Sequence, residues 1–273
     1  MQSIVHVILA GLSSGMFIWL VASGLTLIFG VLGVLNFAHG SFYMLGAYVS
    51  YTLVNAFHPY FWLGVLIAPV VVAAVGYAME HRFLRYVYHL PLPYQLLLTF
   101  AFVLIFDNLV KIIWGAGSLT PPVAAGLAGS VSIVGRKFPV YSLFIIAVGP
   151  VVALGLWAAL EKTWLGRTVR AAASDREMAA ALGVRVPSLF TSVFAFGAWL
   201  GALGGALAVP YVGLLTPGMG ETIIIDAFIG ALLIGILSAF GTRFFPAFDM
   251  FLTFILMAGV LLWRPRGLFG AAA

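Results

Sequence analysis

Apolar runs of about twenty residues recur along almost the whole chain. The approximate runs are 4–30, 38–57, 61–80, 93–114, 139–160, 188–213, 221–241 and 246–263. A run of this length spans the roughly 30 Å hydrocarbon core of a bilayer when it forms a helix. Inside lipid the backbone has no water to bond, and a helix satisfies its own N–H and C=O groups. The pattern therefore predicts an all-α transmembrane bundle of about eight spans.

Composition excludes a soluble fold for these runs. Apolar residues make up 63% of the 273 residues and charged residues only 8%, with a mean hydropathy of +1.15. A water-soluble domain of this size needs a polar exterior that this composition cannot supply. The chain contains no cysteine, which leaves no disulfide and no thiolate metal site. We interpret residues 1–273 as one multi-pass transmembrane domain.

The basic residues report the orientation of the spans. The loop 161–187 carries five of the thirteen Lys and Arg residues, and the segments 81–92 and 261–270 carry two each. The positive-inside rule places all three in the cytoplasm. The loop 115–138 is rich in Gly, Pro and Ser, and we interpret it as external, although it carries Arg136 and Lys137. Three crossings after 161–187 would nevertheless leave the basic tail outside. Either 221–241 is re-entrant, or a crossing is missing.

Sequence motifs for catalysis and nucleotide binding are absent. The chain has no G-x-x-x-x-G-K-[ST] phosphate loop, no H-E-x-x-H zinc motif and no carboxylate pair spaced for acid–base work. We therefore expect no catalytic residue, no metal ligand and no cofactor bound by this chain. Uphill transport would then draw its energy from an ion gradient or from another subunit.

The loop "GRTVRAAASDREMAAALGVRVPSLF" (166–190) predicts a short, sharply delimited helix over 175–182. Ser174 and Glu177 have the spacing of a reciprocal capping box. Gly183 supplies a left-handed residue at the helix end, and Pro187 prevents its continuation. The alanine-rich middle indicates a helix that docks in a partner's groove, although an ordinary solvated linker helix is the alternative.

The sixth run contains "FGAWLGALGGALAVP", in which Gly197, Gly201 and Gly205 recur at every fourth residue. Two consecutive GxxxG units lie on one helix face and let another backbone approach closely. Packing against a neighbouring span of the same chain and contact with another subunit both explain this face.

Polar residues interrupt the first apolar third of the chain in "VLNFAHGSFYMLGAY" (34–48). Asn36 and His39, with Thr26 upstream, form its densest polar cluster, and glycines nearby make an unbroken helix improbable. Broken helices at membrane depth occur where they line a cavity or are buried in protein. The cluster predicts either a translocation pathway or a turn in which Asn36 caps the next helix. Asp226 is a further pathway candidate, or an interfacial residue.

Three segments carry a resemblance to a known family. They are "GLTLIFGVLGVLNFAHGSFYMLGAYVSY" (24–51), "RAAASDREMAAALGV" (170–184) and "LLWRPRGLFG" (261–270). Together they resemble the smaller, LIV-type permease subunit of branched-chain amino acid ABC importers. The resemblance implies half of a translocation pathway in the bacterial inner membrane. It also implies a second related permease, two ATP-binding subunits that use the ATP, and a periplasmic binding protein.

Within that resemblance, 161–187 is similar to the cytoplasmic coupling loop of importer permeases. The residues implied to couple to the ATPase are Ser174, Asp175, Arg176, Glu177, Ala180, Leu182 and Gly183. Permeases for urea or short-chain amides share these motifs and are an alternative. A self-contained ion-coupled transporter or channel is a further alternative, but it would have no need of a docking helix.

One departure from the family pattern concerns the segment 227–235. Family members carry a glycine-rich turn between two helices there, whereas "DAFIGALLIGILSAFGTRFFP" continues without one. Four crossings would return the tail to the cytoplasm, and this chain has room for three. The conflict in the charge pattern and the departure from the family thus describe the same gap.

Overall fold

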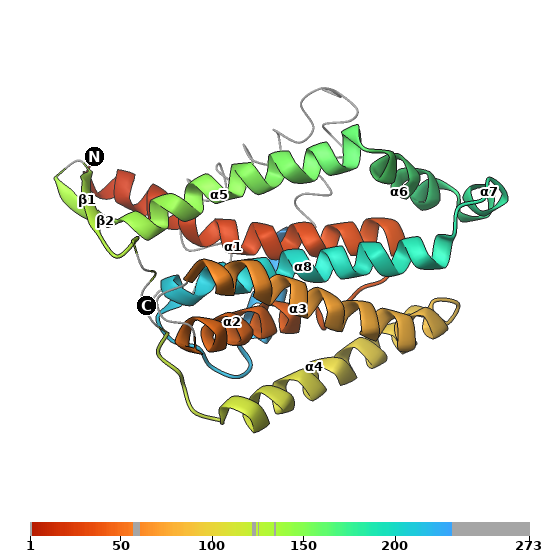
Figure 1. Cartoon of the computed structure of the whole chain (residues 1–273), viewed down its shortest axis with the longest axis horizontal. Coiled ribbons are helices and arrows are strands. Elements are labelled where there is room, and N and C mark those ends of the chain that lie inside the picture. The colour runs from red at the N-terminus through yellow and green to blue at the C-terminus, as the bar shows by residue number, and fades with distance from the viewer. Residues whose placement is uncertain (1, 57–60, 122–123, 125, 134, 231–273) are drawn as a thin grey trace.

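The apolar runs fold as long helices that lie side by side in a bundle (Figure 1). The computed structural model describes residues 2–56, 61–121, 124, 126–133 and 135–230. The long helices are α1 (Gln2–Leu32), α2 (His39–Ala56), α3 (Phe61–Arg82), α4 (Leu92–Trp114), α5 (Val140–Trp157) and α8 (Val186–Val212). They correspond to the first six predicted runs, and the predicted all-α class is confirmed.

Five helices of the described part are long and apolar enough to cross a membrane, namely α1, α3, α4, α5 and α8. Helix α2 is different because it carries several polar residues, and it is enclosed by protein instead: every residue from His39 to Tyr48 is buried. The predicted run 221–241 begins as a helix that covers 219–230. Its remainder, the run 246–263 and the basic tail lie outside the described residues.

Helix α8 is the centre of the bundle and packs against α1, α2 and α3. In the most apolar stretch of α8, 78% is buried, whereas only 17% of the corresponding stretch of the α5 span is buried. Helix α5 lies along α1, and α4 lies beside α2 on the opposite side (Figure 1). The outer helices expose large apolar side chains such as Ile112 and Val151, which suits a surface in contact with lipid.

One end of the bundle gathers the basic loops. It holds the 3₁₀ turn η1 (Leu84–Val87), the π-helical turn η2 (Ala158–Lys162), α6 (Trp164–Ser174) and α7 (Arg176–Ala181). Figure 1 shows these elements at the end opposite the N-terminus. Sequence reasoning predicted one helix in the loop 161–187, and α6 is an addition to that prediction.

The opposite end carries a short hairpin within the predicted external loop. Strand β1 (Ser130–Ile133) pairs antiparallel with β2 (Arg136–Pro139), and Ser130 lies opposite Pro139. The hairpin lies beside the N-terminal end of α1 (Figure 1). Arg136 and Lys137 therefore lie at the end away from the basic loops, as the loop assignment predicts.

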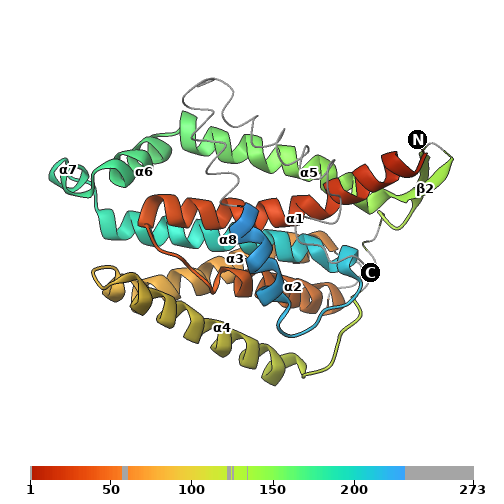
Figure 2. The same ribbon diagram turned by 180° about the vertical axis from the view of Figure 1, so that it is seen from behind.

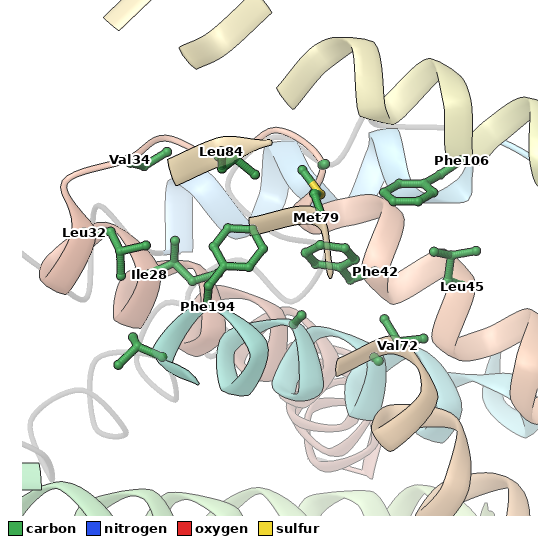
Figure 3. Close-up of a cluster of buried hydrophobic side chains, with 14 of the residues drawn as sticks. Ile28, Leu32, Val34, Phe42, Leu45, Val72, Met79, Leu84, Phe106 and Phe194 are labelled. Atoms are coloured by element: carbon green, nitrogen blue, oxygen red, sulfur yellow. The ribbon is translucent and has the colours of Figure 1, made fainter. Parts of the chain in front are cut away.

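An apolar cluster joins the middle of the bundle to the end that carries the basic loops. Phe42 of α2 contacts the rings of Phe106 and Phe194, with centroids 6.0 Å apart in both pairs. Leu32 and Val34, at the end of α1, belong to the same buried cluster (Figure 3). Within the segment between α1 and α2, Val34, Asn36 and Ala38 are buried, Leu35 and Phe37 are half-buried, and Gly33 is exposed.

Candidate coupling and translocation region

The segment 33–38 is a non-helical break between α1 and α2. Helix α1 ends at Leu32, and Gly33 adopts a left-handed conformation with φ of 72°. The chain then returns along the bundle to the start of α2 (Figure 2). The His39 Nε2 atom lies 2.9 Å from the Val21 carbonyl oxygen, eleven residues before Leu32. At 1.5 Å per residue, α2 begins about 16 Å inside the end of α1.

Asn36 and His39 satisfy backbone groups at this break. The Ala38 N–H donates to Asn36 Oδ1 over 3.1 Å, which forms an Asx turn immediately before the first residue of α2. The Val21 carbonyl only accepts, and His39 Nε2 is therefore the donor in that contact. Both side chains are fully buried. Asn36 Nδ2 and His39 Nδ1 have no hydrogen-bond partner among the described residues, and the pathway role of both stays a prediction.

The other two pathway candidates lie around the same break. Thr26 is half-buried, and its Oγ1 donates to the Ala22 carbonyl of its own helix over 2.7 Å. Asp226 is half-buried on the helix 219–230. That helix covers the break, because the rings of Phe37 and Phe228 lie 5.3 Å apart. Asn36, His39 and the helix that carries Asp226 thus belong to one region of the bundle, whereas the hydrogen bond of Thr26 stays within α1.

The three glycines of α8 face α1 and α2 of the same chain. A Cβ on Gly197 would lie 2.6 Å from Ile28 Cγ1, and one on Gly205 would overlap the Tyr43 carbonyl oxygen. A Cβ on Gly201 would lie 3.2 Å from His39 Nε2. The glycine face therefore brings α8 against the break and against α2, as the intramolecular interpretation of GxxxG describes.

Helix α7 begins one residue later than the capping box predicts. Ser174 is the last residue of α6, and the extended residue Asp175 is the cap, with its Oδ1 accepting from the Met178 N–H over 2.9 Å. The predicted reciprocal bond between Ser174 and Glu177 is thus wrong. The physical reason is α6, which holds Ser174 in helical conformation and leaves Asp175 as the first residue free to extend.

The end of α7 and its two faces define what it can contact. Gly183 has φ of 89°, and the N–H of Val184 donates to the Ala179 carbonyl over 3.1 Å. This pairing closes the helix with a Schellman motif. Ala179 is buried against the bundle, whereas Met178 and Leu182 are 58% and 78% exposed. One face of α7 is therefore anchored and the other presents apolar side chains.

A buried polar network beside α7 was missed by sequence reasoning. Glu80 of α3 is fully buried, and its Oε1 accepts from the Tyr88 hydroxyl over 2.9 Å. Arg85 Nη2 lies 3.7 Å from Glu80 Oε2 and donates to Thr191 Oγ1 of α8 over 2.9 Å. Burial raises the pKa of the Tyr88 hydroxyl, and the nearby charge of Glu80 raises it further. The hydroxyl therefore stays protonated and remains a hydrogen-bond donor. A carboxylate five residues before Arg85 was the signal available in the sequence.

The chemistry available to this region is binding and mechanical connection. Within the described residues, no group of three or more His, Cys, Asp or Glu side chains could hold a metal ion. The region combines neutral polar groups at a helix break in the bundle interior with an exposed apolar helix outside it.

Comparison with known proteins gives a consistent result. The family model described as "branched-chain amino acid transport system / permease component" matches residues 7–263. The chain is 29% identical to the high-affinity branched-chain amino acid transport system permease protein BraD of Pseudomonas aeruginosa, over 95% of this chain and 94% of BraD. It is 26% identical to LivH of Escherichia coli K12, over 95% and 93% of the two chains. No solved structure matches the chain.

The alignments also show that this chain lacks residues that its relatives have. The alignment with BraD extends over 294 positions, more than the 273 residues of this chain. Some positions of BraD therefore have no counterpart here. A shortened chain agrees with the gap that sequence analysis places near 227–235, most of which lies outside the described residues.

Proposed function

This chain belongs to the family of branched-chain amino acid transport system permease components, and from that premise we propose that it is the permease subunit of an ATP-driven importer for branched-chain amino acids. It would form half of the translocation pathway, with a second related permease as the other half. Two ATP-binding subunits and a periplasmic binding protein would complete the assembly in the bacterial inner membrane. ATP would bind the partner subunits, because this chain has no phosphate-binding loop.

The exposed face of α7 is the observation that carries this proposal. A six-residue helix gains little stability from its own hydrogen bonds, yet α7 has a cap at Asp175, a Schellman end at Gly183 and a buried anchor at Ala179. A helix held so firmly at the membrane surface, with Met178 and Leu182 exposed four residues apart, suits insertion into a groove of a partner. A self-contained transporter would have no use for it.

The break at 33–38 supports a conducting role. Backbone that leaves helical structure at membrane depth costs free energy unless protein or a cavity surrounds it. Here that segment places Asn36 and His39 in the bundle interior, and Asp226 lies on the helix that covers it. Thr26 lies on α1, about one helix turn before Gly30 in the sequence. These four residues are the proposed pathway candidates.

Uptake in proteoliposomes tests the proposed function. The chain is purified in mild detergent with the subunits that accompany it, reconstituted, and supplied with binding protein, ATP and radiolabelled leucine. We expect ATP-dependent leucine uptake. Uptake of urea in place of leucine would assign the chain to amide import, and uptake driven by an ion gradient without ATP would refute the importer assignment.

The substitution Leu182→Glu tests the docking face of α7. A carboxylate in an apolar protein groove loses its hydration, so we expect binding of the ATPase subunits and leucine uptake to fall by about tenfold or more. The control Ala171→Glu adds the same charge at an exposed position of α6 and should leave both unchanged. Copurification of the ATPase subunits measures the first effect. Undiminished copurification with Leu182→Glu would remove α7 from the interface.

A further inference from the structure

Arg176 is the first residue of α7, but its side chain turns toward the bundle and not toward a partner. Its Nη2 donates to the carbonyl oxygen of Leu32 over 2.7 Å. Leu32 is the last residue of α1, so this hydrogen bond joins the docking helix directly to the helix that ends at the break. The two residues are 144 positions apart in the chain.

The C-terminal end of α1 is well suited to receive a cation. The last carbonyl groups of a helix have no partner within the helix and carry partial negative charge. Gly33 turns the chain away with φ of 72°, and a Cβ there would lie 3.7 Å from Arg176 Nη2. The left-handed turn of a residue without a side chain thus leaves the Leu32 carbonyl open to the guanidinium.

The other side of the guanidinium rests against a fixed wall. Its Cζ lies 4.9 Å from the centroid of the Phe190 ring on α8. Phe190 is buried and contacts the Tyr88 ring, with centroids 6.4 Å apart. Tyr88 in turn donates to Glu80 of α3. Arg176 therefore lies between the end of α1 and a wall that α3 and α8 hold in place.

Other basic residues of the same cytoplasmic loop have local partners. Arg170 Nη1 pairs with Glu161 Oε1 at 3.1 Å, and Lys162 Nζ lies 5.0 Å above the Trp157 ring. Both contacts stay within η2, α6 and the end of α5. Arg176, by contrast, bonds the α1 terminus directly.

The connection from Leu32 to His39 can lengthen only by a limited amount. Seven Cα-to-Cα steps from Leu32 to His39 reach at most about 25 Å, while the depth to be covered along α1 is about 16 Å before any sideways distance. Val34 and Ala38 are buried within the segment. A shift of the α1 terminus is therefore passed along a short, packed chain to Asn36 and His39.

We propose that Arg176 is the positioning residue that transmits displacement of α7 to the broken segment 33–38, and through it to the pathway candidates. The proposal rests on the proposed importer function and assigns Arg176 a role that faces inward. Binding and release of the ATPase move α7, the guanidinium carries that movement to the Leu32 carbonyl, and the wall at Phe190 keeps the side chain aligned. Arg176 touches no cargo and no nucleotide in this scheme.

The test compares Arg176→Gln and Arg176→Lys in the complete reconstituted importer. Glutamine keeps some length but loses the charge and the flat cation on Phe190. We expect ATPase subunits to bind as in the unsubstituted protein, with leucine uptake per ATP hydrolysed lowered by about tenfold, the loss expected for one charge-assisted hydrogen bond. Lysine keeps the charge and a donor, and should restore part of the uptake. Arg167→Gln on α6 removes the same charge from an exposed position and should change neither quantity.

A second readout follows the break directly. The chain has no cysteine, so Leu35→Cys, a half-buried position in the segment, gives one thiol whose labelling rate can be measured with and without ATP. We expect the rate to depend on ATP in the Leu35→Cys protein and to lose that dependence when Arg176→Gln is added. This loss would not follow from a purely structural role.

The outcomes separate this inference from the proposed function. Leucine uptake by the unsubstituted protein together with normal coupling and normal ATP-dependent labelling in Arg176→Gln would overturn the role of Arg176 alone. If Arg176→Gln does not fold, Arg176→Met decides, because methionine keeps contact with Phe190 but has no donor for the Leu32 carbonyl. Unchanged coupling and labelling in that folded variant would overturn the role as well. Absence of ATP-dependent uptake in the unsubstituted protein would instead refute the importer function.

Discussion

Helices α2 and α7 both start after a short non-helical connection, and in both connections an Asx side chain accepts a hydrogen bond from a backbone N–H near the helix start. Asn36 Oδ1 accepts from the Ala38 N–H over 3.1 Å ahead of α2, and Asp175 Oδ1 accepts from the Met178 N–H over 2.9 Å in α7. The first start lies buried within the bundle, and the second is exposed at its end. The two solve the same backbone problem in different surroundings.

The difference between the two starts follows from desolvation. At the exposed start, water solvates the Asp175 carboxylate, and the charge favours the N-terminal end of the helix. At the buried start, an ionised carboxylate would lose its hydration at a cost of several kcal/mol. Neutral Asn36 and His39 supply the hydrogen bonds there. The helix start that a partner can reach is charged, and the helix start near the proposed pathway is uncharged.

The largest expected effect comes from comparing two glycine-to-alanine substitutions, one in α2 and one just after α7. At Gly40, in the first turn of α2, a Cβ would overlap the carbonyl oxygen of Gly220, and neither backbone can move freely. We expect Gly40→Ala to lower the free energy of unfolding by about 3 kcal/mol or more. At Gly183, behind α7, a Cβ meets nothing within 4 Å, and only its φ of 89° is unfavourable, so Gly183→Ala should cost about 1 kcal/mol.

Thermal unfolding in detergent measures both glycine variants. Equal losses at Gly40 and Gly183 would contradict the close contact between α2 and the helix that starts at residue 219. Such a result would also weaken the contrast between the buried and exposed starts.

Exchanging the two Asx side chains gives the next largest effect. Asn36→Asp places a carboxylate where the side chain is fully buried, and we expect a loss of about 2–3 kcal/mol from its desolvation. Asp175→Asn keeps the acceptor at an exposed start and should change stability by a few tenths of a kcal/mol. Unfolding by heat, followed for the two variants in parallel, compares them. A tolerated Asn36→Asp would show that water reaches the break.

The smallest effect distinguishes the observed cap of α7 from the one that the sequence predicts. Asp175→Ala removes the acceptor of the Met178 N–H and should destabilise α7 by about 1 kcal/mol. Ser174→Ala lies within the last turn of α6 and should be nearly neutral. Hydrogen exchange at the amide of Met178 reports the local effect. Faster exchange at the amide of Glu177 in the serine variant alone would restore the predicted capping box.

Several features were predictable because they depend on local chemistry. Apolar length alone indicates the long helices, since lipid leaves the backbone no other partner. Gly183 indicates the end of α7, because only glycine enters the left-handed region without strain. The location of the cap was not predictable to one residue, because Ser174 and Asp175 are both good caps and the choice depended on where α6 ends.

Other features depended on contacts across the chain. Nothing near Arg176 in the sequence indicates that its partner is the carbonyl of Leu32. Likewise, nothing near Glu80 indicates that it accepts from Tyr88, or that Arg85 beside it bonds Thr191. The glycine face of α8 favoured a neighbouring span over another subunit in the sequence, and the structure identifies the neighbours as α1 and α2. Arg176 and Leu32 are 144 residues apart and Arg85 and Thr191 are 106 residues apart, whereas Glu80 and Tyr88 are only eight residues apart.

The sequence by itself determined that this protein is a helical membrane protein with a polar interruption after its first helix, a short delimited helix in a basic loop, and a family likeness. Those properties follow from hydration, backbone hydrogen bonding and the conformations open to individual residues. Only the tertiary structure decided that α2 starts in the bundle interior and that α7 holds the end of α1. The reason is physical: depth and long-range hydrogen bonds are set by which helices pack together, and no short stretch of sequence contains that information.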